Sequence, residues 1–466
     1  MNEVDADLTV VGSGPGGYVA AIRAAQLGMK VVVVEKGPLG GVCLNWGCIP
    51  VKALLRSAEV YNLMKKAGEF GLSAGNLDFD FSEIIRRSRK TAGRLSGGIG
   101  YLFKKNQIET VPGRGMLTKN RGILVLDSAG NETARVVSKF TLLAAGAHPA
   151  GLPFAPFDGK RILSSADAMI LETPPKSLLI IGAGAIGIEF ADFYRTFGTE
   201  ITIVELLPHV LPTEDPDIAA VLHRSFRKRK MKILTDTVVT DIKIGKESVT
   251  VYAKSPEGEQ ELAAERLLVS VGVVPNSDGL GLEEAGVEVE RGFIRINEMY
   301  RTSVPTIYAV GDLIGPPYLA HVASAEGITA VEHMAGLEVS PLDTGTIPAA
   351  VYAHPQVARV GLTEDEAVKR GYEVKAGRFP FAANGKALTM GETAGMVKLV
   401  FEAQSGELLG GHIVGENASE LIGEVTMAKR HGATYRSILK TVHSHPTLSE
   451  SIMEASGDAW GEAIHI

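Results

Sequence analysis

The sequence predicts an α/β protein with two Rossmann-like dinucleotide-binding domains, followed by an α+β domain at the C-terminal end. Three observations support this prediction. One βαβ pattern occurs twice, glycines are in excess with 53 copies, and the last third of the chain changes to hairpin-like strands. The length of 466 residues also exceeds one hydrophobic core, because domains usually contain about 100–200 residues.

The repeated pattern recurs at an offset of 170 residues. In the first copy, strands expected at 8–11 and 31–35 flank a glycine-rich turn and a helix; in the second, strands at 178–181 and 201–205 do the same. The matching positions are Gly12, Gly14, Gly17, Gly28 and Glu35 in the first copy, and Gly182, Gly184, Gly187, Gly198 and Glu205 in the second.

Each matched position has a physical reason. The first glycine allows a tight turn, the second lets a pyrophosphate approach the positive end of a helix, and the third lets helix and strand pack closely. The acid 23 positions after the first glycine ends the second strand, where its carboxylate can hold ribose hydroxyls. One such turn also occurs without a nucleotide, but two copies in full context indicate two dinucleotides.

Glu205 favours NAD over NADP as one of these dinucleotides. A carboxylate about 4 Å from a 2′-phosphate would cost on the order of several kcal/mol at an effective dielectric near 20. Residues 206–210 contain no Arg or Lys to offset that repulsion.

Composition excludes several other classes of protein. A net charge of -7 gives no support for nucleic-acid binding. No run of 18 apolar residues predicts a membrane span, and the acidic start does not resemble a secretory signal. Two cysteines are too few for a disulfide-stapled secreted scaffold or, without other cysteine ligands, for a zinc site. We expect a cytoplasmic or matrix-like location and no metal.

The last third predicts an α+β domain. Residues 396–401 and 408–414 are strand-like and are joined by Gln404-Ser405-Gly406, which is typical of an antiparallel hairpin. Asn417, with Glu420 three residues later, predicts a capping box that opens a helix ending at Gly432.

Cys43 and Cys48 are the strongest candidates for chemistry, because both lie in one glycine-rich segment just after the first nucleotide motif. Two inert buried thiols or a structural disulfide are the alternatives, and a loop this short would stabilise the fold only modestly. Residues five apart on a regular helix have Cα atoms about 7.5 Å apart, beyond the roughly 4.4–6.8 Å that a disulfide spans. We therefore expect Pro50 and the glycines to distort the turn, and the ammonium of Lys52 to lower a thiol pKa.

The segment GGVCLNWGCIPVK at 40–52 resembles the redox-active site of the pyridine nucleotide–disulfide oxidoreductases, and in particular the branch that acts on lipoamide. The resemblance covers essentially the whole chain. Its small polar residue after Pro50 is replaced by Val51, and Trp46 occupies a variable position; both changes are expected to alter substrate access or flavin potential.

This resemblance implies FAD and NAD as cofactors and assigns their contacts. Thr306–Asp312 is similar to the family's second FAD motif, whose Asp holds the ribityl chain, and Leu319-Ala320-His321 follows it as in the lipoamide enzymes. The implied FAD contacts are Gly12, Gly14, Gly17, Glu35, Lys52, Gly115, Gly146, Asp312 and Ala320, and the implied NAD contacts are Gly182, Gly184, Gly187, Glu205 and Gly272.

The resemblance also implies catalytic roles. Cys43 would be the interchange thiol that meets substrate, and Cys48 the charge-transfer thiol beside the flavin. Lys52 would pair with Glu189, for which a solvated helix position is the weaker alternative because its neighbours are apolar.

His445 and Glu450 complete the predicted catalytic set. The segment HSHPTLSE at 443–450 resembles the family's HxHPTxxE signature. An imidazole at His445 can deprotonate a thiol, and a carboxylate at Glu450 can fix its tautomer. His443 carries no assigned role and is treated as a surface residue.

The family implies a homodimer in which this segment reaches the cysteine pair of the other subunit. The predicted domains are 1–148 (FAD, first part), 149–275 (NAD), 276–346 (completing the FAD site) and 347–466 (dimerisation). The implied activity oxidises protein-bound dihydrolipoamide with NAD, on a lipoyl-bearing domain of a 2-oxo acid dehydrogenase or glycine cleavage complex.

Three alternatives to this activity remain open. A glutathione reductase-like enzyme would want a basic pocket after the second motif, and a mercuric reductase would need C-terminal cysteines; neither is present. A flavin-binding interaction subunit with little catalysis is the third.

The basic stretch 224–232 is a solvated helix face or, less simply, a docking patch for an acidic partner domain.

Overall fold

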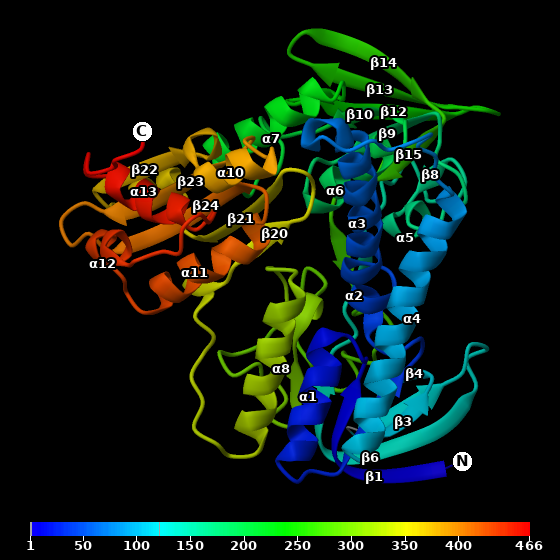
Figure 1. The fold of residues 1–466 in the computed structure, drawn as a ribbon. Helices are drawn as coiled ribbons and strands as arrows, with labels where there is room; N and C mark the ends of the chain where they lie inside the picture. The colour runs from blue at the N-terminus through cyan, green and yellow to red at the C-terminus, as the bar shows by residue number, and fades with distance from the viewer. Residues whose placement is uncertain (1, 121) are drawn as a thin grey trace. The chain divides into compact units, whose positions relative to one another are not determined.

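The computed structural model describes residues 2–120 and 122–466, and the chain divides into two compact units (Figure 1). Unit 1 comprises Met1–Ala53, Ser82–Ala150 and Gly272–Leu342, and unit 2 comprises Leu54–Phe81, Gly151–Val271 and Asp343–Ile466. No helix among the described residues is both long and apolar enough to cross a membrane.

Unit 1 is built on a seven-stranded sheet in the order β3-β2-β1-β6-β5-β4, with β19 also beside β6. Its strands are β1 (Asn2–Val11), β2 (Val31–Glu35), β3 (Glu109–Pro112), β4 (Arg114–Leu117), β5 (Ile123–Leu126), β6 (Glu132–Leu143) and β19 (Ile307–Ala309). The strands β1, β2, β3, β6 and β19 run parallel, whereas β4 and β5 join through antiparallel pairs.

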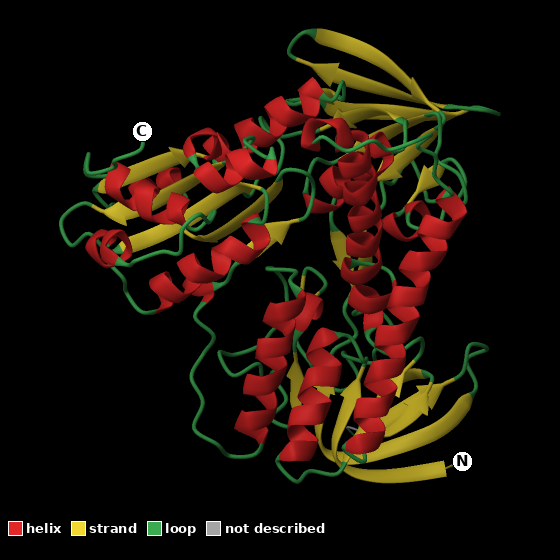
Figure 2. Ribbon diagram, viewed as in Figure 1, coloured by secondary structure: helices red, strands yellow, loops and turns green. Residues whose placement is uncertain are grey.

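Both faces of this sheet are covered, so β2 is apolar except for its last residue, Glu35, and β1 carries Leu8, Val10 and Val11 in its second half. On one face, α1 (Pro15–Gln26) and α8 (Ala320–Met334) lie side by side, and residues from the last turns of α4 (Phe81–Lys105) complete the core (Figure 2). On the other face, apolar residues of β4, β5 and the 280–313 region pack against β1 and β2.

Several short elements complete unit 1. They are α2 (Gly41–Asn45), the start of α3 (Cys48–Lys65), η2 (Gly311–Leu313), and the strand pairs β7 (Ala147–Pro149) with β16 (Val273–Pro275) and β17 (Val289–Glu290) with β18 (Phe293–Ile294).

Unit 2 contains a five-stranded parallel sheet in the order β11-β10-β9-β15-β8. These strands are β8 (Ile162–Leu163), β9 (Ser177–Ile181), β10 (Glu200–Val204), β11 (Lys232–Leu234) and β15 (Arg266–Val269); the helices are α5 (Ser165–Ala168), α6 (Ala185–Thr196) and α7 (Pro216–Lys228). An antiparallel sheet of β12 (Val238–Ile244), β13 (Val249–Ser255) and β14 (Gly258–Ala264) packs against it. Both predicted βαβ patterns are therefore confirmed, one in each unit.

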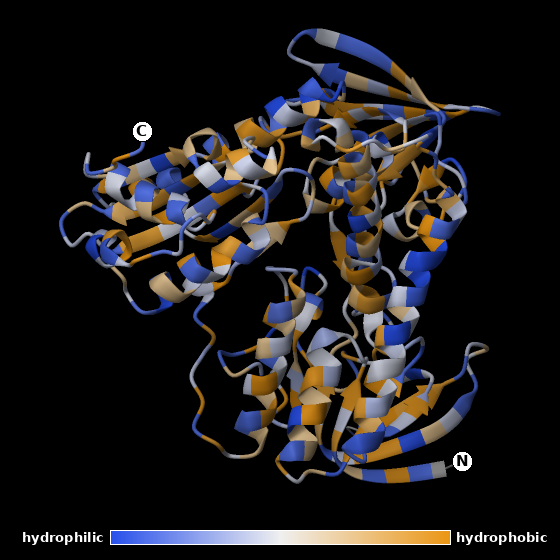
Figure 3. Ribbon diagram, viewed as in Figure 1, coloured by the Kyte–Doolittle hydropathy of each residue, from blue (hydrophilic) through white to orange (hydrophobic). Residues whose placement is uncertain are grey.

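The C-terminal part of unit 2 is an antiparallel sheet in the order β20-β21-β24-β23-β22. Its strands are β20 (Ala349–Val351), β21 (Gln356–Gly361), β22 (Val374–Pro380), β23 (Met396–Glu402) and β24 (Leu408–Gly415). The helical elements are α9 (Glu364–Lys369), α10 (Gly385–Met390), α11 (Ala418–Arg430), α12 (Tyr435–Lys440) and α13 (Glu450–Asp458), with η1 (Ala67–Phe70), η3 (Thr344–Thr346) and η4 (Phe381–Ala383) elsewhere in the unit. The predicted hairpin of β23 and β24 is confirmed, and its apolar residues form the core of this sheet (Figure 3).

One sequence prediction in this region is wrong. Asn417 precedes α11 as expected, but its backbone is left-handed (φ 58°, ψ 21°) and its side chain makes no capping hydrogen bond. Ser419 in the first turn instead donates from its amide and its hydroxyl to the side chain of Gln356 on β21. A contact between strand and helix thus replaces the expected local cap.

Candidate active site

The two glycine-rich turns have the same geometry. Gly12 and Gly182 both have φ of +99°, and a Cβ on either would lie 2.4 or 2.5 Å from a carbonyl oxygen of a neighbouring strand. A Cβ on Gly17 would lie 2.0 Å from the carbonyl oxygen of Gly12, and the same distance separates Gly187 from Gly182. The first and third glycines are therefore required by the packing of strand against helix.

The second glycine of each turn has a different reason. Gly14 and Gly184 are the N-cap residues of α1 and α6, and their backbones are extended. Neither helix start has a capping hydrogen bond from a side chain of its N-cap residue. A Cβ on either residue would meet no atom within 4 Å. An anion can therefore approach the exposed amides at each helix start, which fits the pyrophosphates of FAD in unit 1 and NAD in unit 2.

The two acids that follow these turns also make equivalent contacts. Glu35 accepts hydrogen bonds from the amides of Ser13 and Gly37, both at 2.8 Å. Glu205 accepts from the amides of Ala183 at 2.6 Å and Leu207 at 2.9 Å. Each carboxylate is thus fixed beside its glycine turn and keeps lone pairs for ribose hydroxyls.

The cysteine pair lies where two short helical segments of unit 1 meet. Cys43 is in α2, which ends at Asn45, and Cys48 is the first residue of α3. The expected distortion of the turn is therefore present at Trp46 and Gly47, whereas Pro50, which was also expected to distort it, lies in the first turn of α3. Both cysteines are free thiols, Cys43 half-buried and Cys48 exposed.

The environment of Cys43 keeps this thiol protonated. Its hydrogen bond with Cys48 raises the pKa of Cys43 most, burial raises it further, and the ammonium of Lys52 acts in the opposite direction. At Cys43, the effect of Lys52 on the pKa is thus outweighed by the hydrogen bond and by burial; its predicted effect on Cys48 remains a prediction. A protonated thiol needs an external base before it can attack or leave readily.

Asp312 lies in η2, and burial raises the pKa of its carboxyl group. The preceding residue, Gly311, donates its amide to Glu326 of α8 at 2.7 Å. Sequence reasoning missed Glu326, because it lies within a helix with no motif of its own.

The remaining predicted cofactor contacts of unit 1 are backbone positions. Gly146 has φ of +67° with open space around it, and Asn276 fixes it by donating its amide to the Gly146 carbonyl and its side chain to the Ala145 carbonyl. Gly115 is packed, since a Cβ there would lie 3.0 Å from Val11. Ala320 is the first residue of α8. Gly272, assigned to NAD, begins the last segment of unit 1 and accepts the amide of Ala150.

His445 and Glu450 of unit 2 are joined as predicted by a hydrogen bond of 2.9 Å between Nδ1 and Oε1. The amide of Thr447 donates to the other oxygen of Glu450 at 2.8 Å. Burial opposes the ionised form, yet these two bonds hold the pKa of Glu450 below its usual value. The His445 side chain is 79% exposed, so its Nε2 faces outward from this pair and is accessible to a reacting thiol.

The surface position expected for His443 is wrong: only 6% of its side chain is exposed, and its two nitrogens contact the Thr441 carbonyl and Glu424. The buried position favoured for Glu189 is confirmed, because it is 4% exposed and accepts the amide of Tyr352 at 3.0 Å. The predicted pairs Lys52–Glu189 and His445–Cys43 would each combine residues of different units and remain predictions.

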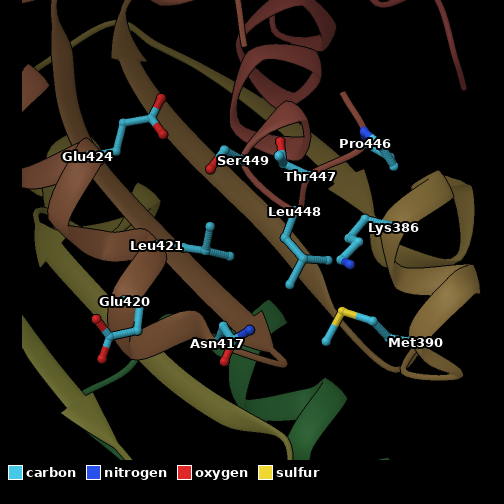
Figure 4. Close-up of a pocket in the computed structure, with 10 residues that line it drawn as sticks. All are labelled: Lys386, Met390, Asn417, Glu420, Leu421, Glu424, Pro446, Thr447, Leu448 and Ser449. Carbon is cyan, nitrogen blue, oxygen red and sulfur yellow. The ribbon is translucent and has the colours of Figure 1, made fainter. Parts of the chain in front are cut away.

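A pocket of about 680 Å³ lies beside the His445–Glu450 segment (Figure 4). Met390, Leu421 and Leu448 point toward its centre, and Glu420 and Glu424 lie along one side (Figure 4). The other lining residues are Lys386, Asn417, Pro446, Thr447 and Ser449.

Comparison with known proteins assigns the family. Residues 6–327 match the model described as pyridine nucleotide-disulphide oxidoreductase, and residues 347–456 match the dimerisation domain of the same family. The chain belongs to the pyridine nucleotide-disulphide oxidoreductases. It is 47% identical to the dihydrolipoyl dehydrogenase of Chlorobaculum tepidum, covering 97% of each chain, and 42% identical to one from Bacillus subtilis, covering 98% of this chain and 99% of the relative.

Solved structures agree with this assignment. The crystal structure of LpdA from Mycobacterium tuberculosis superposes with a TM-score of 0.89 at 29% identity, covering 98% of this chain and 99% of that one. The flavoprotein disulfide reductase RclA from Escherichia coli has a TM-score of 0.87 at 25% identity, with the same coverage.

Membership of the pyridine nucleotide-disulphide oxidoreductases confirms several sequence predictions. The fold class, the oxidoreductase activity and the cofactors FAD and NAD follow from the family and the two phosphate-binding turns. The dimerisation domain supports the predicted homodimer.

Proposed function

We propose that this oxidoreductase is a dihydrolipoyl dehydrogenase, which oxidises dihydrolipoamide to lipoamide and reduces NAD. The observation that carries this proposal is the pairing of two thiols, Cys43 and Cys48, with an imidazole whose tautomer is fixed by Glu450, in a chain 40–47% identical to proteins of that name over nearly its full length. Glu205 and the absence of a basic residue at 206–210 support NAD over NADP.

The reaction is a thiol–disulfide exchange. In the oxidised enzyme, Nε2 of His445 takes the proton of one substrate thiol, and the thiolate attacks Cys43, so that the bond between Cys43 and Cys48 breaks and Cys48 leaves as a thiolate. The second substrate thiol then attacks the substrate sulfur of the mixed disulfide, releases lipoyl disulfide and leaves Cys43 reduced. Two electrons pass from substrate to the cysteine pair. Of the two substrate protons, one ends on the sulfur of Cys43 and the other on Nε2 of His445, while Cys48 remains a thiolate.

The residues around this exchange support it electrostatically. The hydrogen bond with Cys48 and burial raise the pKa of Cys43, and the ammonium of Lys52 opposes that rise. The same ammonium can stabilise the thiolate of Cys48, four residues away on α3. Glu450 stabilises the imidazolium that forms when His445 takes a proton. Glu189, buried in α6, is the proposed partner of Lys52.

When bound, FAD would supply the redox chemistry that links the dithiol to NAD. In this proposal, residues 1–148 and 276–346 hold FAD, through the turn at Gly12–Gly17, Glu35 and Asp312. Residues 149–275 hold NAD, through the turn at Gly182–Gly187 and Glu205. Residues 347–466 form the dimer, and His445 serves the cysteine pair of the partner subunit.

The substrate is proposed to be a lipoyl group on a domain of another protein, in a 2-oxo acid dehydrogenase or glycine cleavage complex of the cytoplasm. The relatives named dihydrolipoyl dehydrogenase support this substrate class. A lipoylated domain that is a better substrate than free dihydrolipoamide would support the protein-bound form.

The decisive experiment compares the purified holoenzyme with dihydrolipoamide and NAD, and with glutathione disulfide and NADPH. We expect rapid turnover only with the first pair, and its loss in Cys43→Ser and in His445→Gln. Refolding these two inactive chains together tests the shared site, because a heterodimer then contains one intact site and should recover part of the activity. Activity that is unaffected by Cys43→Ser would refute the proposal.

A further inference from the structure

The redox-active segment of unit 1 is held by three consecutive residues of α4. Arg87 donates to the carbonyl of Ala53 at 2.8 Å, and Ser88 donates to the carbonyl of Pro50 at 3.1 Å. Arg89 donates to the carbonyl of Asn45. Of these three acceptors, only Asn45 lies between Cys43 and Cys48 in the sequence. Pro50 and Ala53 follow the second cysteine in α3.

The backbone around the cysteines has little restraint of its own. Gly40 and Gly41 precede Cys43 with φ of +98° and +59°, and Gly47 precedes Cys48. Glycines allow many backbone conformations, and α2 and α3 are interrupted at Trp46 and Gly47. The distance between the two sulfur atoms therefore depends on what holds the residues between them.

Two residues between the cysteines are held from outside that stretch. Asn45 is 5% exposed, and its side-chain amide donates to the carbonyls of Leu39 and Gly41 at 3.0 Å. The guanidinium of Arg89 lies 4.3 Å from the ring centre of Trp46 while it also binds the Asn45 carbonyl. A planar guanidinium can make both contacts together, whereas an ammonium is a single point charge.

We propose that Arg89, together with Trp46, is a positioning residue that sets the thiol–disulfide equilibrium of Cys43 and Cys48. The inference rests on the proposed function, in which the pair accepts two electrons as its disulfide opens to the thiol of Cys43 and the thiolate of Cys48. A disulfide requires a narrow geometry, and the free thiols here already share a hydrogen bond. Holding the loop raises the effective concentration of one sulfur at the other and favours the disulfide.

We call the contacts of Arg89 with the Trp46 ring and with the Asn45 carbonyl the clamp. Removal of the clamp should make the disulfide easier to reduce. We expect Arg89→Lys, Arg89→Met and Trp46→Leu each to lower the equilibrium constant for disulfide formation about tenfold, which raises the two-electron reduction potential by about 30 mV. Arg87→Lys is the matched control, since Arg87 makes the same kind of bond from the same helix but to Ala53, outside the pair. Its potential should equal that of the wild type.

The measurement uses the FAD-loaded full chain equilibrated with graded ratios of oxidised and reduced dithiothreitol. Free thiols are then trapped with an alkylating reagent and counted by mass spectrometry. Thermal unfolding and FAD content of each variant show whether it is folded; if Arg89→Lys does not fold, Trp46→Leu carries the same expectation. Arg89→Lys with Trp46→Leu should shift the potential no further than either change alone, since both break one clamp.

Several outcomes would overturn the inference. If Arg89→Lys behaves as wild type and Arg89→Met lowers the potential, Arg89 acts through its charge and not through position. An equal shift in Arg87→Lys would show a general effect of α4, and unchanged potentials in all variants would show that the clamp is irrelevant to the equilibrium. If the wild-type cysteines do not interconvert with disulfide at all, the proposed function fails instead.

Discussion

The hydrogen bond between His445 and Glu450 leads to an unusual prediction for the variant Glu450→Gln. In the structure, the carboxylate accepts from two donors, the amide of Thr447 and Nδ1 of His445. A glutamine offers one oxygen as acceptor and one NH₂ as donor. Because the Thr447 amide can only donate, it takes the oxygen, and the NH₂ then faces His445. The imidazole must become the tautomer with its proton on Nε2, which cannot act as a base there.

The magnitude follows from the contacts that are lost. Glu450→Ala removes a charge-assisted hydrogen bond of about 1.5 kcal/mol, at the low end of the range, because water can replace it around a His445 side chain that is 79% exposed. One decade of rate corresponds to about 1.4 kcal/mol, so we expect kcat to fall about tenfold. In Glu450→Gln, breaking the new bond to regain the active tautomer costs about 1 kcal/mol more, and kcat should fall about a hundredfold.

Stability should follow the opposite order. The glutamine keeps the bond to the Thr447 amide at the start of α13, whereas the alanine loses it. A merely structural role for Glu450 would therefore make the alanine variant the less active of the two. The assay measures kcat for dihydrolipoamide and NAD with both substrates saturating, beside thermal unfolding. NADH-dependent reduction of a dye serves as the control, since it does not need His445. A glutamine variant as active as the alanine variant would refute the tautomer argument.

Two further predictions concern other parts of the molecule. Gly14→Ala should fold, because a Cβ at Gly14 meets no atom, yet bind FAD at least tenfold more weakly than wild type because its methyl group occupies the approach to the helix start; FAD content against thermal unfolding checks this, and full FAD content would contradict it. In unit 2, burial opposes the ionised forms of Glu392 and His354. Hydrogen bonds from His354 and Lys66 nevertheless lower the pKa of Glu392 from 4.5 to about 2, and the bond to Glu392 raises the pKa of His354 above 6.5. The Glu392 contribution to stability is lost as pH falls from 4.5 toward 2, and the His354 contribution is lost as pH rises through its folded pKa. The loss of melting temperature in Glu392→Gln should therefore be largest between pH 4.5 and 6.5 and decline on both sides, and a loss that does not vary with pH would exclude this linkage.

Local sequence signals predicted much of the fold and the pairing within the site. The strand predicted at 31–35 is β2, and the strand predicted at 178–181 is β9 with one more residue. Glycine spacing and apolar runs identify such elements because each acts over a few neighbouring residues. The pairing of His445 with Glu450, five residues apart, was predicted from the resemblance of residues 443–450 to the family signature.

Contacts between distant segments were not predictable from such signals. Asn276 bonds the carbonyl of Ala145 across 131 positions, and Arg89 bonds that of Asn45 across 44. Neither residue belongs to a repeated pattern, and an arginine in an amphipathic helix is ordinarily read as solvated. The wrong prediction for Asn417 has the same origin, since Gln356 from another strand binds the first turn of α11. The hydrogen bonds at these positions are made with residues that are distant in the sequence. Local patterns do not show which distant residues become neighbours in the fold.

Each half of the proposed thiol exchange is prepared within its own unit. The cysteine pair is fixed in unit 1 by Asn45 and Arg89, and the imidazole is fixed in unit 2 by Glu450. The raised pKa of Cys43 means that its half holds a protonated thiol and performs little chemistry without a base. In the proposed homodimer, the imidazole of His445 from the other subunit would supply that base.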